Sequence, residues 1–135
     1  MGHPIMFDED DPVLALLRQA ASQLPEVHEK VSHGRPFLCA GEKGKGFAMY
    51  GASEKTPPKG YVQHEQAVIL KPDPAEARVL ADDDRFFSPM YYGPSGWLAL
   101  DLDVEGTDWD EVAELLDASY RQVATARLVR LLDER

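Results

Sequence analysis

Four lysines lie in two glycine- and proline-rich segments of the chain, residues 41–46 and 51–63, where their side chains could meet an anion. Such segments between apolar runs predict hairpin turns, and lysines on projecting turns can contact the phosphates of a nucleic acid. The competing interpretation is that the lysines only solvate exposed turns. Our candidate nucleic-acid-binding residues are these lysines and one arginine: Arg35, Lys43, Lys45, Lys55 and Lys59.

Charge is distributed unevenly along the chain. The formal net charge is −10, yet residues 30–71 hold seven Lys or Arg against three Asp or Glu, which leaves this stretch at +4. The rest of the chain holds seven basic and 21 acidic residues. Such a chain is too acidic to cover a polyanion with its whole surface, so contact with nucleic acid must be local. We therefore expect DNA binding to be weak and sensitive to salt.

Aromatic side chains gather in a second candidate site. Five of the 12 aromatic residues fall between residues 86 and 97, around a Gly-Pro-Ser-Gly sequence at residues 93–96. Aromatic side chains on a loop can anchor a protein partner or stack on bases. The alternative is that these rings close the open end of a small core. Our candidate partner-binding residues are Phe86, Phe87, Tyr91, Tyr92 and Trp97.

No set of residues has the spacing of a catalytic or metal centre. The four histidines lack metal-ligand spacing, and no serine lies in a Gly-x-Ser-x-Gly motif. The glycines of residues 41–46 do not form a P-loop, because a predicted strand follows them. Asp101 and Asp103 share one strand face, which is more typical of a solvent face than of a catalytic carboxylate pair. We expect a protein that is not an enzyme and needs no metal or cofactor. A small-molecule or enzymatic site beside Trp97 is the least favoured alternative.

Length and composition indicate one domain over residues 1–135. A chain of this size buries about two thirds of its unfolded surface, and 44% hydrophobic with 28% charged residues is typical of globular proteins. No apolar run approaches the roughly 20 residues of a membrane span, and the acidic first residues differ from a signal peptide. The only cysteine, Cys39, has apolar neighbours that indicate a small buried side chain. We expect a cytoplasmic protein without membrane contact.

Periodicity and capping signals predict the order helix, three or four antiparallel strands, short helix, strand, long helix. Asp11 and Pro12 start a helix that reaches Leu24. The predicted strands are residues 27–31, 37–40, 47–50, 66–71 and 97–102, and the later helices are residues 73–81 and 108–124. Residues 51–63 are predicted to form a projecting, mobile loop.

Strands flanked by helices are typical of an α+β fold, here a single antiparallel sheet with the N- and C-terminal helices packed on one face. Apolar spacing gives the expected core. Its members are Val13, Leu16, Leu17, Leu98, Leu100, Val112, Leu116, Tyr120 and Val123.

Several stretches of the chain resemble the MmcQ/YjbR family of small bacterial proteins. They are HGRPF at residues 33–37, the glycine hairpin leading into FAMY at 47–50, YGPSGWLAL at 92–100 and WDEVAELLDASYRQVA at 109–124. The resemblance extends from residue 14 to residue 132. It departs at Thr125 and Ala126, where relatives often have Pro-Lys.

This resemblance implies a CyaY-like, frataxin-like fold, a bacterial cytoplasmic setting and DNA binding through paired wing-like hairpins. The wings would fall on residues 41–46 and 51–63. A frataxin-like iron role would use the acids of residues 8–11, which a helix cap explains equally well.

Overall fold

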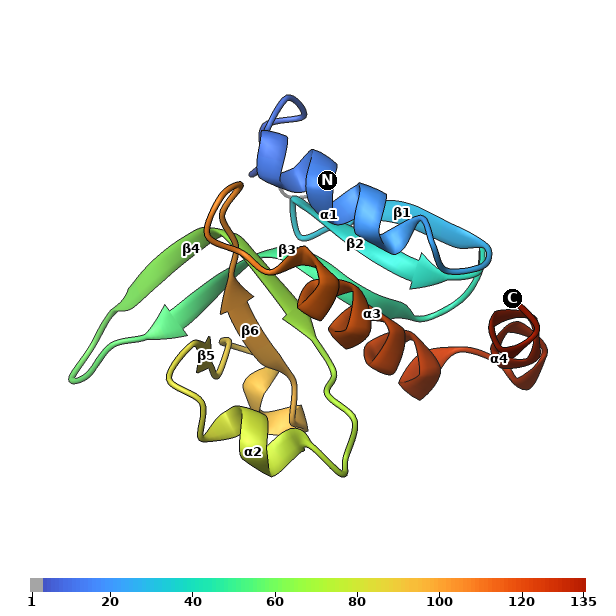
Figure 1. Ribbon diagram of the computed structural model, residues 1–135. Helices are drawn as coiled ribbons and strands as arrows, with labels where there is room; N and C mark the ends of the chain where they lie inside the picture. The colour runs from blue at the N-terminus through green and yellow to red at the C-terminus, as the bar shows by residue number, and fades with distance from the viewer. Residues whose placement is uncertain (1–3) are drawn as a thin grey trace.

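The structure is a computed structural model that describes residues 4–135 and contains one sheet and four α-helices (Figure 1). The helices are α1 (Pro12–Ala21), α2 (Ala77–Ala81), α3 (Trp109–Val123) and α4 (Ala126–Asp133), with a single 3-10 turn, η1, at Gly93–Ser95. The strands are β1 (Val27–Ser32), β2 (Arg35–Ala40), β3 (Gly46–Lys55), β4 (Tyr61–Leu70), β5 (Phe86–Phe87) and β6 (Leu98–Asp101). The predicted α+β class is confirmed.

All six strands form one antiparallel sheet in the order β1-β2-β3-β4-β6-β5. Strands β1 to β4 follow one another as a meander, so each turn between them lies at the end of the sheet opposite to the previous turn. Strand β6 then adds to the free edge of β4. The predicted single antiparallel sheet is confirmed.

Helices α1 and α3 cover one face of the sheet (Figure 1) and enclose the main core. The apolar spacing placed most of this core correctly, because Val13, Leu17, Val112, Leu116 and Tyr120 are all buried. Three other expected members are only partly buried, and Leu14 and Leu115 take core positions that the sequence analysis did not assign. The partly buried members are Leu16, Leu98 and Val123.

Acidic caps start the two long helices where the sequence predicted. The Asp11 carboxylate accepts a hydrogen bond from the backbone N–H of Val13 at 2.9 Å. The Asp108 carboxylate accepts from the N–H groups of Asp110 and Glu111 at 3.1 and 3.2 Å. Helix α1 ends at Ala21, three residues before the predicted end, because the chain turns there toward Pro25.

Two side chains of α3 also form polar contacts with the rest of the fold. The buried Ser119 hydroxyl donates to the carbonyl of Phe47 at 2.6 Å and accepts from the N–H of Lys71 at 2.9 Å. The Tyr120 hydroxyl donates to the carbonyl of Pro25 at 2.7 Å, and its ring meets Phe47 edge-on at 5.3 Å. These contacts hold the long helix in one register against β3 and β4.

The second face of the sheet is covered by the aromatic connection between β5 and β6 instead of a helix. A small apolar cluster of Met49, Ala52, Ala67, Ile69 and Ala99 lies on this face. Four aromatic side chains pack against that cluster: Phe37, Phe87, Tyr92 and Trp97.

Strands β3 and β4 form a long hairpin that projects from the body of the molecule (Figure 1). The prediction of an irregular loop over residues 51–63 is wrong, because β3 continues to Lys55, β4 begins at Tyr61, and only residues 56–60 form the turn. The strands hold few apolar residues here, so the sequence shows little alternation. Gly51, at φ +97°, lies at a register shift that bends β3 where the projecting part begins.

Helix α4 was not predicted. Thr125 caps it by accepting a hydrogen bond from the N–H of Leu128, and Leu128 is buried in the main core. Figure 1 shows α4 at the end of the sheet opposite to the β3–β4 hairpin. None of the helices within residues 4–135 is long and apolar enough to cross a membrane.

Candidate functional site

The two basic turns lie at opposite ends of strand β3. Lys45 immediately precedes the strand and Lys55 is its last residue. Because a strand rises about 3.3 Å per residue, the two ends are about 30 Å apart. Consecutive hairpins of a meander share a strand, so their turns cannot be neighbours. The structure therefore does not bring Lys43 and Lys45 together with Lys55 and Lys59, as paired wings would require.

All four lysines are exposed. Within residues 4–135 none of them forms an ion pair with a carboxylate, whereas Arg18, Arg85, Arg121 and Arg127 all do. The four lysines are therefore available to an external anion.

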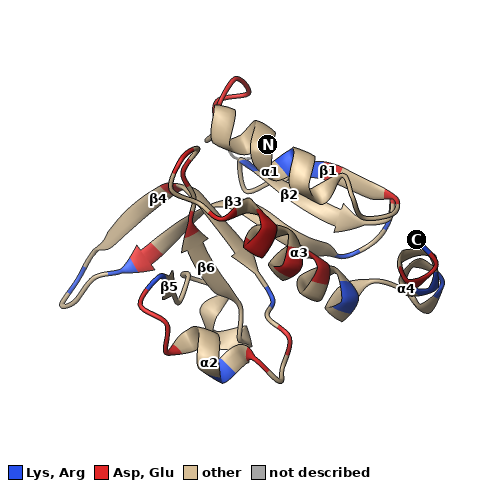
Figure 2. Cartoon of the chain, viewed as in Figure 1, with Lys and Arg blue, Asp and Glu red and all other residues tan. Residues whose placement is uncertain are grey.

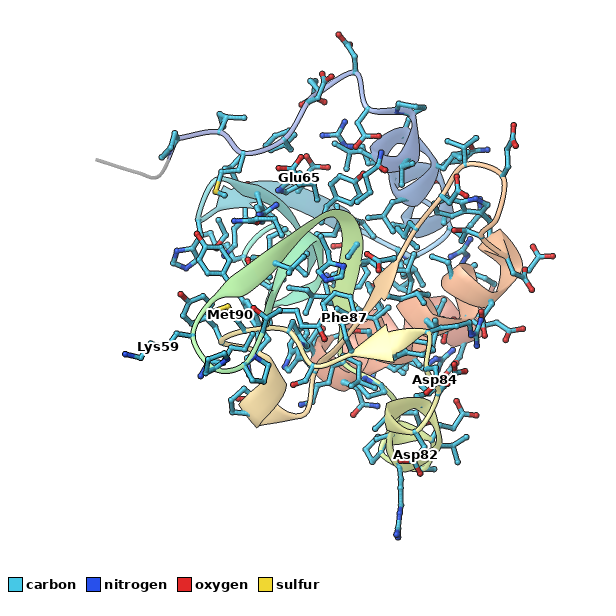
Figure 3. All side chains as sticks on the ribbon, turned by 90° about the vertical axis from the view of Figure 1, so that its left-hand side faces the viewer. Lys59, Glu65, Asp82, Asp84, Phe87 and Met90 are labelled. Carbon is cyan, nitrogen blue, oxygen red and sulfur yellow. The ribbon has the colours of Figure 1, made fainter. Side chains whose placement is uncertain are left out.

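The tip of the β3–β4 hairpin combines two lysines with exposed apolar side chains. Lys55 precedes the turn and Lys59 lies within it; the turn is closed by a hydrogen bond from the N–H of Thr56 to the carbonyl of Gly60 at 3.1 Å. Tyr61 is 59% exposed and Val62 is 47% exposed. Figure 2 shows basic residues at this tip, and Figure 3 shows Lys59 pointing away from the body of the protein. The sequence analysis missed Tyr61, although its place directly after a turn was a usable signal.

The β2–β3 turn is more compact. The N–H of Gly44 donates to the carbonyl of Gly41 at 3.0 Å, and the N–H of Gly41 donates to the carbonyl of Glu26 at 2.9 Å. Glu42 lies beside Lys43, so this turn carries an acid among its cations. With two lysines and one acid, this turn has the same formal charge as the β3–β4 tip with Lys55, Lys59 and Glu54.

Arg35 differs from the four lysines because it is buried. Only 7% of the residue is exposed, and its Nη2 donates to Oε1 of Gln63 at 2.6 Å. Burial lowers the pKa of the guanidinium, and the nearby Glu65 carboxylate opposes that change. Arg35 therefore does not belong to a surface that could contact a nucleic-acid backbone, and its inclusion with the four lysines is corrected.

His64 lies near the base of the projecting hairpin between two carboxylates. Its Nδ1 is 2.9 Å from Oδ1 of Asp101, its Nε2 is 3.0 Å from Oε1 of Glu54, and its ring stacks on Phe87 at 4.1 Å. Carboxylates only accept hydrogen bonds, so a ring nitrogen of His64 that carries a proton donates to the carboxylate beside it. The sequence analysis linked Asp101 with Asp103 instead, because the pairing of β4 with β6 was not known.

The carboxylates of Glu54 and Asp101 approach different nitrogens of His64 and do not converge on one point. Among residues 4–135 no group of three or more His, Cys, Asp or Glu side chains is placed to hold a metal ion. Cys39 is buried, as predicted, and burial raises the pKa of its thiol. A buried thiol of this kind is a poor nucleophile.

The five candidate partner-binding aromatics do not form one exposed surface. Phe86 is 7% exposed and belongs to the main core, and Phe87, Tyr92 and Trp97 pack against the second face of the sheet. Only Tyr91, at 84% exposure, is available to a partner. The interpretation as core aromatics therefore holds for four of the five residues.

A comparison with protein families identifies the family of this chain. A family model described as YjbR matches residues 22–122, which is most of the sequence. The chain belongs to the YjbR family. A comparison with curated proteins gave no match. In this YjbR-family chain, the matched span contains both basic turns and ends within α3, so α4 lies beyond it.

Proposed function

We propose that this YjbR-family protein binds nucleic acid through the tip of the β3–β4 hairpin. Lys55 and Lys59 would contact phosphates, and Tyr61 would pack against a sugar or a base. The observation that carries the proposal is the presence of two exposed lysines, without an ion pair among residues 4–135, beside an exposed aromatic ring on a hairpin that projects from the body. We propose a cytoplasmic binding protein and not an enzyme. The frataxin-like fold that the family resemblance implies remains an expectation.

The arrangement of acids supports this choice of contact surface. Glu54, the carboxylate next to Lys55 in sequence, is held by His64. Many of the other acids lie on α3, on the connection into it and on the segment before α1, as Figure 2 shows. A phosphate chain that crosses only the hairpin tip therefore stays outside the most negative part of the protein.

Salt dependence gives the direct test. Two phosphate contacts predict a slope of about −2 for the logarithm of the association constant against the logarithm of salt concentration on duplex DNA. The measurement is fluorescence anisotropy of labelled duplex and single-stranded oligonucleotides, starting at low salt. Binding of the single strand that depends on Tyr61 would show that the ring stacks on bases.

The second basic turn supplies a matched control. The double variant Lys55→Ala/Lys59→Ala should reduce the salt slope by about two, whereas Lys43→Ala/Lys45→Ala removes the same charge and should leave the slope unchanged. If both double variants reduced the salt slope equally, both turns would contact the nucleic acid, and binding by the β3–β4 tip alone would be refuted. No binding by the unmodified protein at low salt would refute the proposed function itself.

One observation keeps the alternative of a protein-interaction surface in view. Tyr91 is 84% exposed on the aromatic connection. Binding to a protein through this ring would change little with salt and would be lost in Tyr91→Ala.

A further inference from the structure

A cavity of about 540 Å³ lies on the second face of the sheet, beside the base of the projecting hairpin. Its size falls in the range of small-molecule sites. The larger side chains that line it include His33, Arg35, Tyr91, Tyr92 and the methionines Met6, Met49 and Met90. It shares none of the exposed residues of the hairpin tip, so it is independent of the proposed nucleic-acid contact.

Strand pairing creates this cavity. Strand β2 pairs with β3 through Phe37 and Met49, and continuing that register places Arg35 opposite Gly51, at the start of β2. Past this point the carbonyl of Ser53 on β3 accepts its hydrogen bond from the N–H of Met90 at 2.8 Å. The aromatic connection is thus held against β3, and Figure 3 shows Met90 beside the hairpin.

Arg35 is a buried cation that forms no ion pair among residues 4–135, although the more distant Glu65 carboxylate acts on its charge. Only 7% of the residue is exposed. The neutral amide of Gln63 takes one of its five N–H groups. Buried charges in proteins are normally paired with an opposite charge. The guanidinium therefore has both the charge and the remaining donors to bind an anion.

Gly51 allows the guanidinium to occupy this place. A Cβ at position 51 would lie 1.9 Å from Nη1 of Arg35, so any larger residue would displace the side chain. The backbone glycine and the buried arginine therefore form one preorganised unit at the wall of the cavity.

The rest of the cavity is suited to an apolar ligand body. Met6, Met49 and Met90 are three of the four methionines in the chain, and all three line it. Methionine side chains are flexible and polarizable, so they adapt to apolar ligands of different shape. One arginine with thioether and aromatic walls matches a single carboxylate on an apolar body, since the guanidinium fork pairs with a carboxylate through two hydrogen bonds.

We propose that this cavity binds a small organic acid, whose carboxylate pairs with Arg35 and whose apolar body lies between the three methionines.

The test is a titration of the protein labelled with ¹³C at its methionine methyl groups. Octanoate is the probe, and octanamide, which has the same chain without the charge, is the control ligand. Saturable shifts of the Met6, Met49 and Met90 methyl signals are expected with octanoate. Octanamide should bind at least about tenfold more weakly, because it lacks the charge-assisted hydrogen bonds.

Two charge-removing variants separate the pocket from the general surface. Arg35→Gln should weaken octanoate binding by about tenfold or more. Lys59→Gln removes the same charge at the hairpin tip and should keep the affinity within about twofold. If Arg35→Gln does not fold, the comparison of octanoate with octanamide still decides the role of charge. Tyr91→Ala, an exposed change at the cavity wall, then tests its location by weakening octanoate binding about threefold or more.

Three results would overturn the proposal. They are unchanged methyl signals at millimolar octanoate, equal affinity for octanoate and octanamide, and equal effects of Arg35→Gln and Lys59→Gln.

Discussion

Replacement of Ser119 by alanine should destabilise the protein far more than the small change in volume implies. Continuing the register of β3 and β4 past Ala48 and Leu70 brings Phe47 opposite Lys71. At this pair the Ser119 hydroxyl stands between the two strands, since it accepts from the N–H of Lys71 at 2.9 Å and donates to the carbonyl of Phe47 at 2.6 Å. The hydroxyl thus joins α3 to both strands at once.

The size of the effect follows from the groups that the variant leaves unpaired. Ser119 is fully buried, so water cannot replace its hydroxyl without a rearrangement. A buried donor or acceptor that loses its partner costs about 1–3 kcal/mol, and two such groups give an expected loss of about 2–6 kcal/mol in the free energy of unfolding. The assay is urea unfolding followed by circular dichroism, with the slope against denaturant used to check that the unfolded state is unchanged.

Ser22→Ala is the matched control. The Ser22 hydroxyl donates to the carbonyl of Gln19 at 2.6 Å at the exposed end of α1. Its removal should cost no more than about 0.5 kcal/mol, because water reaches the freed carbonyl. If Ser119→Ala costs less than about 1 kcal/mol, the strands close on each other without the hydroxyl, and its role as an inserted link is refuted.

Three further predictions concern the core, the base of the hairpin and pH. Leu116→Ala should lower the free energy of unfolding by about 2–5 kcal/mol in urea, because the residue is fully buried between α3 and the sheet; a cost within error would mean that the helix face is misassigned. Gly51→Ala should cost about 2 kcal/mol or more, since φ is +97° and the new Cβ would lie 1.9 Å from Nη1 of Arg35; an unchanged melting temperature would contradict this. Burial raises the pKa of Tyr50 and Tyr120. The stability that these two groups contribute is complete below the ordinary tyrosine pKa of about 10 and is lost as the pH rises through their folded-state values. Unfolding in urea at pH 8 and above pH 10 checks this, and equal stability at both would be evidence against it.

The helices and the sheet could be predicted because their signals are local. A carboxylate at Asp11 or Asp108 followed by apolar residues at helical spacing specifies a helix start, and both caps form as expected. Alternation likewise placed β1 and β6, and short apolar runs between turns placed parts of β2, β3 and β4. These features depend on residues a few positions apart, which a single sequence displays.

The projecting hairpin could not be predicted from the same signals. Near its tip the side chains of both strands face mostly solvent, so they lack the apolar alternation that a buried face imposes. Pro57, Pro58 and Gly60 lie only in the turn, yet together with the lack of alternation they led to the prediction of a loop over all of residues 51–63. The extent of the strands is fixed by the pairing from Ala52 with His64 to Lys55 with Tyr61, and pairing between strands is a long-range property.

The candidate sites depended on long-range pairing even more. Arg35 reads as a surface cation in sequence, because nothing near it reveals that β3 and the aromatic connection bury it. The contact of His64 with Asp101 joins residues 37 positions apart through the pairing of β4 with β6. Composition predicted that basic and aromatic side chains would matter, but only the sheet order shows which of them meet.

Helix α4 gives the two basic turns unequal access to a large partner. Leu128 packs beside Gly41, and Arg127 forms an ion pair with Glu26, whose carbonyl accepts from the N–H of Gly41. The β2–β3 turn is thereby built into a broad end of the molecule, whereas the β3–β4 tip stands clear of it (Figure 1). A stiff polymer can approach the β3–β4 tip from several sides. It can approach the β2–β3 turn from fewer sides, because α4 packs beside that turn. An eight-residue helix outside the matched family span thus adds to the difference in access between the two turns.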